Sequence, residues 1–430
     1  MSSHQEAFLD KIPQGWTFDR LKDVVALRNE KTDEVSADKD YLELEDLESG
    51  TGRIINRRNT LEVESAVTRF KKGDVLFGKL RPYLEKVYVA EFDGKCTGEI
   101  LALKPERLES QFLFYCIASR WFIERCNALA YGAKMPRVSW EKQLSQFDLP
   151  QPPLKEQRCI AAYLDASCLA IDAAVAAKRQ QLETLNATWE GILESAVTKG
   201  IRKKTTTYTI SRDWIDVLPA TWQAVRIKRV VSRVDYGISV SSEQEGRYPV
   251  LKMGNIQAGE IVFSKIEFVD DVAAELILET NDLLYNRTNS PDQVGKAAIY
   301  RGTKKDGVTF ASYLVRLRPN HRVLPNFLAH VLNCRGFLEF ARKLAIPSVQ
   351  QSNLNSTRYG QLHAPLPPLS EQQEIVEWLD NKREAIARVA STIEKQIEIL
   401  VGYRKSLIHE CVTGQHRITD KDVDRMRMYV

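Results

Sequence analysis

Two segments of the sequence resemble phosphate-binding or catalytic motifs, and each lacks a residue that the chemistry requires. Gly73 to Lys79 (GDVLFGK) has the spacing of a phosphate-binding loop, but Leu80 follows where a hydroxyl residue would hold Mg²⁺. Pro291-Asp292 with Lys296 suggests a nuclease, yet no acidic residue lies two positions before the lysine. No N-P-P-[YF] or D-P-P-Y tetrapeptide of an amino-methyltransferase is present. We therefore predict no catalytic residue and expect the chain not to be an enzyme.

The cysteines and histidines do not form a metal-binding pattern. Seven cysteines are scattered through the sequence without a C-x-x-C pair, and no histidine stands near them at ligand spacing. None of the six histidines pairs with a candidate nucleophile at a matching repeat position. The sequence therefore predicts reduced cysteines in the core, no metal site, and no general acid or base.

Four loops instead carry side chains suited to reading DNA. Arg, Lys, Asn and Gln can contact base edges or phosphates when a loop brings them to a groove. The loops lie at 79–86 (KLRPYLEK), 133–140 (AKMPRVSW), 287–296 (RTNSPDQVGK) and 348–355 (SVQQSNLN). The candidate contacts are Lys79, Arg81, Lys86, Lys134, Arg137, Arg287, Asn289, Lys296, Gln350, Gln351 and Asn353. A solvated surface position is the alternative for each of them.

These loops occur in pairs because the sequence is duplicated. Residues 112–165 align with 327–380 without a gap, at a constant offset of 327 − 112 = 215, and 17 of the 54 positions are identical. Upstream, IPQGW at 12–16 matches LPATW at 218–222, and GDVLFGKLR at 73–81 matches NDLLYNRTN at 281–289. The paired loops differ in chemistry, since they are cationic in the first half and amide-rich in the second. Two similar halves with different loop chemistry, and so with different contacts, would follow.

Each half is expected to combine short strands with helices. The segments VVALR, DVLFGKL, KVYVAEF and ILALKP are rich in β-branched and aromatic residues and are predicted to be strands, and residues 109–131 a helix. Trp16 and Trp222 are expected to anchor the two cores. The Pro-Pro pairs at 152–153 and 367–368 are expected to open new helices, the second with a capping box of Ser370 and Gln373.

The helices that follow are predicted to be long and to carry a heptad seam. The first runs from about 154 to 197, and its apolar residues recur at three- and four-residue spacing. The seam residues are Leu164, Ile171, Val175, Leu182, Leu185, Ile192, Leu379, Ile386, Ile393, Ile397, Leu400 and Leu407. We expect the two helices to pair antiparallel, the alternative being that each lies on its own domain. Lys178, Arg383 and Arg404 break the seam, and they either set its register or mark where another subunit binds.

The predicted fold class is α+β, with two pseudo-symmetric globular domains of small mixed sheets and helices separated by an antiparallel coiled coil. The expected boundaries are 1–150 and 218–365 for the globular domains, 151–200 and 366–413 for the long helices, 201–217 for a basic and polar linker, and 414–430 for a tail. Hydrophobic residues make up 43% and charged residues 27%, which is typical of a globular protein. No apolar run approaches a bilayer span and no secretory signal is apparent, so we expect a cytoplasmic protein that does not bind membranes.

This organisation resembles the specificity subunit of type I restriction-modification systems. The residues that carry the resemblance are LPQPPLKEQRCIAAYLD and APLPPLSEQQEIVEWLD, the openings IPQGW and LPATW, and the segment KKGDVLFGKLRPYL. Thr221 replaces the glycine of the first opening, and Lys155 stands where Ser370 lies in the second copy. The resemblance covers nearly the whole chain.

The resemblance implies a subunit that recognises a bipartite double-stranded DNA site. It also implies that the helices dock two methyltransferase subunits, which carry S-adenosylmethionine, and that motor-nuclease restriction subunits join them. This chain would hold no cofactor itself. Two alternatives remain open, namely a single-chain restriction endonuclease or methyltransferase with duplicated binding domains, and a coiled-coil scaffold that binds only protein. The net charge of +4 permits a DNA partner without requiring one.

Overall fold

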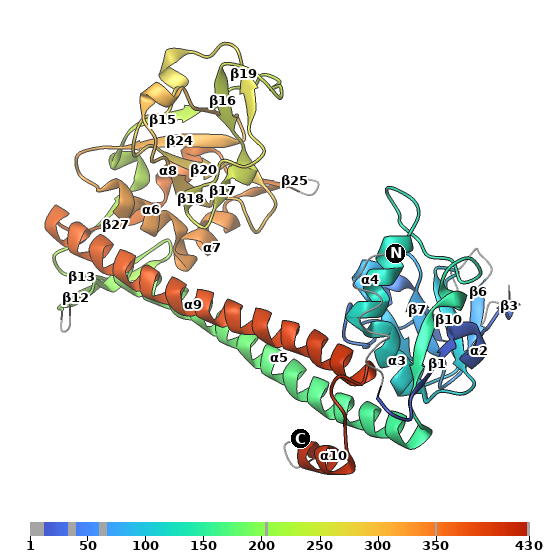
Figure 1. Cartoon of the computed structure of the whole chain (residues 1–430). Coiled ribbons are helices and arrows are strands. Elements are labelled where there is room, and N and C mark those ends of the chain that lie inside the picture. The colour runs from blue at the N-terminus through green and yellow to red at the C-terminus, as the bar shows by residue number, and fades with distance from the viewer. Residues whose placement is uncertain (1–12, 33–39, 60–66, 203–204, 349–350, 428–430) are drawn as a thin grey trace. The chain divides into compact units, whose positions relative to one another are not determined.

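The computed structural model describes residues 13–32, 40–59, 67–202, 205–348 and 351–427 (Figure 1). The chain divides into two compact units. The first unit comprises Met1–Arg179 and Glu394–Val430, and the second comprises Gln180–Ile393. Each unit therefore consists of a globular part from one half of the sequence and a segment of each long helix.

In the first unit, the four segments that the sequence predicts to be strands form the central sheet. This sheet has the strand order β2-β10-β7-β8, with bounds Val25–Leu27, Ile100–Pro105, Val75–Gly78 and Val87–Val89. A second sheet has the order β3-β6-β9-β4-β5, with bounds Lys31–Thr32, Val67–Phe70, Gly94–Cys96, Asp40–Leu42 and Arg58–Asn59. Strand β1 (Thr17–Arg20) follows the buried Trp16 and pairs antiparallel with β11 (Asp148–Gln151).

The second unit repeats this plan with a larger central sheet. That sheet has the order β15-β24-β20-β22-β18-β17, with bounds Val231–Tyr236, Leu314–Pro319, Leu283–Asn286, Ala297–Ile299, Glu260–Ile261 and Ile256–Gln257. Beside it is a sheet of order β19-β16-β23, with bounds Glu267–Val269, Tyr248–Leu251 and Thr309–Phe310. Strand β14 (Gln223–Arg226) follows the buried Trp222 and pairs with β27 (His363–Leu366), as β1 pairs with β11.

The helix predicted over 109–131 is interrupted, which corrects the sequence prediction. It consists of α3 (Ser110–Ala118) and α4 (Arg120–Leu129), because Ser119 adopts an extended conformation and caps α4 through its hydroxyl group. The second unit has the same break at Cys334, between α6 (Pro325–Asn333) and α7 (Arg335–Lys343). In both units a single residue in an extended conformation therefore separates the two helices.

A buried glutamine explains the repeated P-P-L-x-E-Q sequence. In the first unit Gln157 donates to the carbonyl oxygen of Pro152 at 2.9 Å and accepts from the backbone N–H of Glu109 at 2.9 Å. In the second unit Gln372 donates to the carbonyl oxygen of Pro367 at 2.9 Å. It also accepts from the backbone N–H that precedes α6, at 2.7 Å. The motif thus ties the start of each long helix to the globular part of its unit.

The long helices are continuous and begin directly after the Pro-Pro pairs. Helix α5 spans Leu154–Lys199 and α9 spans Leu369–Val412. The predicted capping box is wrong, because α9 already begins before Ser370, which lies exposed inside the first turn. The carbonyl oxygen of Pro368 accepts from the backbone N–H groups of Glu371 and Gln372 instead.

The core of each unit contains both long helices, which lie side by side in Figure 1. In the first unit Leu164 and Ile171 of α5 share the core with Leu407 of α9. In the second unit Leu193 shares it with Leu379. Since the beginning of one helix packs with the end of the other, the pair is antiparallel and the predicted α+β fold with a coiled coil is confirmed. Every predicted seam side chain is buried or half-buried.

Two other features of composition have a packing explanation. Helix α5 is long and apolar enough to span a membrane by length and composition, and 39% of the stretch concerned is buried within the protein. A core helix passes the same test, and the alanines and apolar seam residues of α5 account for its hydropathy. All seven cysteines are free thiols, and each is buried except Cys159, which is half-buried.

The segments expected to be a linker and a tail contain regular structure. The linker forms a hairpin of β12 (Thr207–Arg212) and β13 (Ile215–Pro219), in which Ile215 joins the core of the second unit. The tail contains helix α10 (Asp420–Arg427), and Ile418 and Val423 join the core of the first unit. A few well-placed apolar residues therefore order segments whose average composition is polar.

Candidate nucleic-acid interface

The two loops predicted to read DNA in the first unit are joined by backbone hydrogen bonds. The N–H of Val138 donates to the carbonyl oxygen of Lys79 at 3.1 Å, and the N–H of Arg81 donates to that of Pro136 at 2.7 Å. Loops that lie some 50 residues apart in the sequence therefore form one continuous surface. The sequence predicts both loops but not their contact.

Within this surface Arg81 and Lys134 have exposed side chains, whereas Lys79 is half-buried. Arg81 adopts a left-handed conformation with φ 52°, directly before the short 3₁₀ helix η3 (Pro82–Leu84). A non-glycine residue rarely takes this conformation, and when it does the surrounding structure usually holds it there. The turn therefore holds the Arg81 backbone in a defined position and leaves its side chain in solvent.

Two other first-unit candidates are occupied within the protein. The Nζ atom of Lys86 donates to the carbonyl oxygens of Leu44 and Leu47 at 2.6 and 2.9 Å, so its charge stabilises a neighbouring loop. The Nε atom of Arg137 lies 3.1 Å from Oε2 of Glu99. Hydrogen bonding to this carboxylate raises the pKa of Arg137. Lys86 is therefore a structural cation, and the guanidinium group of Arg137 is paired with Glu99.

In the second unit the two predicted loops are joined by a small sheet. Its strand order is β21-β26-β25, with bounds Thr288–Asn289, Gln351–Asn353 and Ile346–Ser348. The N–H of Leu354 also donates to the carbonyl oxygen of Arg287 at 2.8 Å, just as Val138 donates to Lys79 in the first unit. Both units therefore bring their candidate loops together at equivalent positions of the repeat.

The second-unit candidates are more closely packed than those of the first. The guanidinium carbon of Arg287 lies 5.1 Å from the ring centroid of Tyr236, and its Nη1 donates to the carbonyl oxygen of Ser312 at 3.2 Å. The Nδ2 atom of Asn353 donates to the hydroxyl oxygen of Thr288 at 2.9 Å. These contacts fix the direction of the arginine and of the amide, as base recognition requires.

The remaining second-unit candidates differ in accessibility. Gln351 is exposed and Asn289 is half-buried. Lys296 is half-buried and donates from Nζ to Oε1 of Gln293 at 2.9 Å, and burial lowers its pKa. Gln350 lies outside the described residues. The exposed amide of Gln351 is thus the second-unit group that is freest to meet a base edge.

Exposed aromatic side chains accompany both loop pairs, and the sequence analysis did not identify them. Tyr83 is 51% exposed and Tyr131 is 56% exposed in the first unit, and Tyr313 is 47% exposed in the second. The backbone carbonyl oxygen of Tyr313 accepts from the backbone N–H of Arg287, at the start of the second loop pair. The sequence signal that could have identified them is a tyrosine close to a cation in a loop, because aromatic rings that flank cations can stack on bases or sugars.

The chemical motifs rejected from the sequence have other roles in the structure. Val75 to Gly78 form the buried strand β7, whose backbone is paired in a sheet and cannot cradle a phosphate. Asp292 is exposed and accepts from the hydroxyl group of Ser290 and the amide of Gln293. Within the described residues no group of three or more His, Cys, Asp or Glu side chains is placed to hold a metal ion.

Comparison with known proteins gives matches over most of the chain. Residues 13–184 and 219–399 match the family described as type I restriction modification DNA specificity domain. The chain is 29% identical over 205 residues to the putative type I restriction enzyme MjaX specificity subunit of Methanocaldococcus jannaschii. This match covers 46% of the chain and 47% of that relative, so the chain aligns with about half of the relative's length.

Two further similarities extend over nearly the full length. The type I restriction enzyme MjaVIII specificity subunit of the same organism is 22% identical over 431 residues, which cover 95% of this chain and 94% of the relative. A solved structure, whose title concerns complex assembly and conformational transition of the type I R-M system, superimposes with a TM-score of 0.73. It is 20% identical, and the match covers 94% of this chain and 100% of that one. This similarity shows that the two proteins share a fold.

Proposed function

Because this chain belongs to the type I restriction-modification DNA specificity family, we propose that it reads a bipartite, asymmetric DNA site, one half with each unit. The sequence between the two half-sites would be unspecified, since each unit presents one pair of reading loops. Two units that differ in loop chemistry then imply two different half-sites.

One observation carries this proposal: the paired loops occupy the same place in both units but present different groups. In the first unit the exposed groups are the cations of Arg81 and Lys134. In the second, Arg287 lies over the ring of Tyr236, and the strand that carries the amides of Gln351 and Asn353 pairs with the two residues after Arg287. Arginine and lysine suit the acceptor atoms of guanine, whereas asparagine and glutamine suit the mixed donor and acceptor pattern of adenine.

We propose further that the chain acts as a non-catalytic cytoplasmic subunit. Two methyltransferase subunits, each with its own S-adenosylmethionine, would dock on the long helices, and motor-nuclease subunits would join for cleavage. Large apolar side chains lie exposed on those helices, as docking requires, among them Leu169, Val389, Ile399 and Tyr403. Membership in the specificity family also supports the assignment as a non-catalytic subunit.

The test of DNA reading uses the purified full chain and a library of duplexes with random sequence. Sequencing of the bound fraction is expected to give two separated half-sites, and binding should weaken steeply with salt because phosphate contacts release counterions. Arg81→Ala should alter the first half-site, whereas Lys395→Ala, an exposed cation on α9, should alter neither. Binding that does not select any sequence would contradict the proposal.

The rival functions are distinguished by two further measurements. The purified chain alone is expected neither to cleave nor to methylate DNA, whereas a single-chain restriction endonuclease or methyltransferase would do so. Co-expression with a methyltransferase from the same genome should give a stable complex. A chain that captures the methyltransferase but never binds DNA would be a protein-only scaffold.

A further inference from the structure

Two of the three basic residues that interrupt the helix seams contact the globular parts of their units. Arg404 of α9 is only 11% exposed, and its Nη1 donates to the carbonyl oxygen of Gly50 at 2.7 Å. Arg383 of the same helix donates from Nη2 to the carbonyl oxygen of Ala258 at 2.9 Å. Each of these carbonyl groups lies in the turn that follows a short 3₁₀ helix, Leu44–Asp46 in the first unit and Met253–Asn255 in the second. Arginines placed so near the core require such partners, because an unpaired buried charge is strongly unfavourable.

In the first unit this contact belongs to a larger network of charges. The Nε atom of Arg404 lies 3.2 Å from Oδ1 of Asp172 on α5. The other carboxylate oxygen of Asp172 lies 3.2 Å from Nη2 of Arg53, which follows the Gly50 turn. Asp172 thus links the two arginines, so both long helices hold the turn at 50–53.

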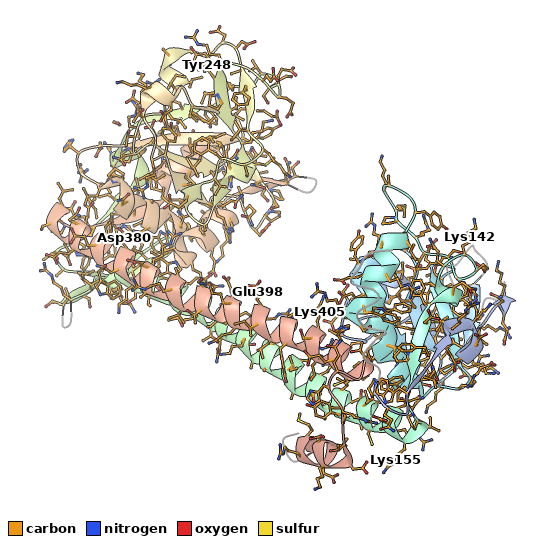
Figure 2. The ribbon with its side chains drawn as sticks, in the orientation of Figure 1. Lys142, Lys155, Tyr248, Asp380, Glu398 and Lys405 are labelled. Carbon is orange, nitrogen blue, oxygen red and sulfur yellow. The ribbon has the colours of Figure 1, made fainter. Side chains whose placement is uncertain are left out.

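The neighbouring residue extends the network to the reading loop. Lys405, labelled in Figure 2, places its Nζ 2.6 Å from Oε1 of Glu85. The carbonyl oxygen of Glu85 also accepts from the N–H of Gly50 at 3.0 Å. Glu85 closes the turn that begins at Arg81, and both residues are left-handed, with φ 51° and 52°. Helix α9 therefore holds one end of the turn that presents Arg81.

We propose that Arg404 and Lys405 are positioning residues for the reading turn from Arg81 to Glu85. They set which base the first unit accepts without touching DNA themselves. This inference rests on the proposed function, because it assumes that Arg81 reads DNA. It also predicts an asymmetry. Gly295 lies two residues before β22, as Glu85 lies two residues before the equivalent strand β8, and it has no side chain for a helix lysine to hold.

The test exchanges the charges of Lys405 and Glu85 in the full chain. The measurement is binding to duplexes that carry single base changes in either half-site. Lys405→Glu and Glu85→Lys each place like charges together, and each should lower discrimination at the first half-site by about three- to tenfold. The second half-site should be read as in the wild type. The double variant restores the ion pair with reversed polarity and should recover most of the discrimination.

Lys395→Glu is the matched control, because Lys395 is an exposed lysine on the same helix. It should leave both half-sites unchanged. Glu85→Gln keeps the side-chain volume and should give a smaller loss of discrimination at the first half-site. It replaces Glu85→Lys as the single variant if Glu85→Lys does not fold. Equal losses at both half-sites, or no loss in the single variants, would overturn the inference. A wild-type chain that selects no sequence would instead overturn the proposed function itself.

Discussion

At the scale of single residues, the neighbours of a cation decide whether it can contact DNA. Lys86 and Arg81 lie on the same turn, yet one is occupied by two carbonyl oxygens and the other is exposed. The sequence identifies both as cations on a loop. It cannot separate them, because the carbonyl groups that bind Lys86 come from residues some 40 positions away.

The first prediction concerns the exposed arginine. Arg81→Ala should weaken the DNA complex by roughly 1 to 3 kcal/mol if the side chain reads a guanine, with discrimination lost only in the first half-site. Arg137→Ala should also weaken it, and Glu99→Gln should recover part of that loss because it removes the carboxylate that Arg137 neutralises. Competition binding with altered half-sites measures both. If either substitution instead lowers discrimination at the second half-site, the assignment of the first unit to the first half-site is wrong.

The duplicated tryptophans provide a matched pair for the second prediction. The Nε1 atom of Trp222 donates to Oε2 of Glu371 at 3.0 Å, in a buried environment. Trp16 Nε1 is buried without a hydrogen-bond partner among the described residues. Both Trp→Phe substitutions lose volume, but only Trp222→Phe leaves a buried carboxylate unpaired. It should lower the free energy of unfolding by about 1.5 to 3 kcal/mol more than Trp16→Phe. Equal losses in urea denaturation would argue against this role of Glu371.

At the scale of elements, local patterns predict the long helices and the four strands of the first unit's central sheet, but not the interruption of the shorter helices. Heptad spacing and the Pro-Pro pairs are local signals, and α5 and α9 follow them closely. The break at Ser119 depends on how α3 and α4 pack against the sheet, which no local pattern contains. The β12–β13 hairpin was missed because a few apolar residues, among them Ile215, order a segment of polar composition.

The third prediction tests the helices as parts of two cores. Leu164 and Leu379 are fully buried at equivalent positions of the repeat, at an offset of 379 − 164 = 215. Either Leu→Ala substitution should destabilise the protein by about 2 to 5 kcal/mol, through lost burial and the cavity left behind. Leu185→Ala serves as the control and should cost less, because that side chain is half-buried. The measurement is denaturant unfolding, and equal losses in all three variants would contradict the assigned cores.

At the scale of the whole molecule, duplication gives one chain two similar units whose paired loops differ in chemistry. Each long helix contributes to both units, with the division at 179/180 in α5 and at 393/394 in α9. The sequence predicts this organisation because 17 of 54 aligned positions retain the same residue. It does not predict the recognised bases, since the conformation of each loop decides which base edge a side chain meets.

The fourth prediction treats the helix pair as a ruler for the DNA spacer. One heptad inserted into each helix preserves the seam and adds ~10 Å of helix at 1.5 Å per residue. At roughly 3.4 Å per base pair this corresponds to about three more base pairs. Twisting and bending of the DNA can reduce the shift. The assay is methylation by the reconstituted complex on substrates with graded spacers. The half-site sequences should stay the same, and an unchanged optimal spacer in an active variant excludes the ruler.

The most direct test of bipartite reading is a genome-wide map of methylated adenines in the source organism, compared with a strain that lacks this chain. We predict that the deletion removes one methylation motif, made of two short and different half-sites separated by a fixed number of unspecified bases. Arg81→Ala in the chromosomal gene should change only one of the half-sites. A motif that is continuous or perfectly palindromic, or a map that the deletion leaves unchanged, would contradict the account.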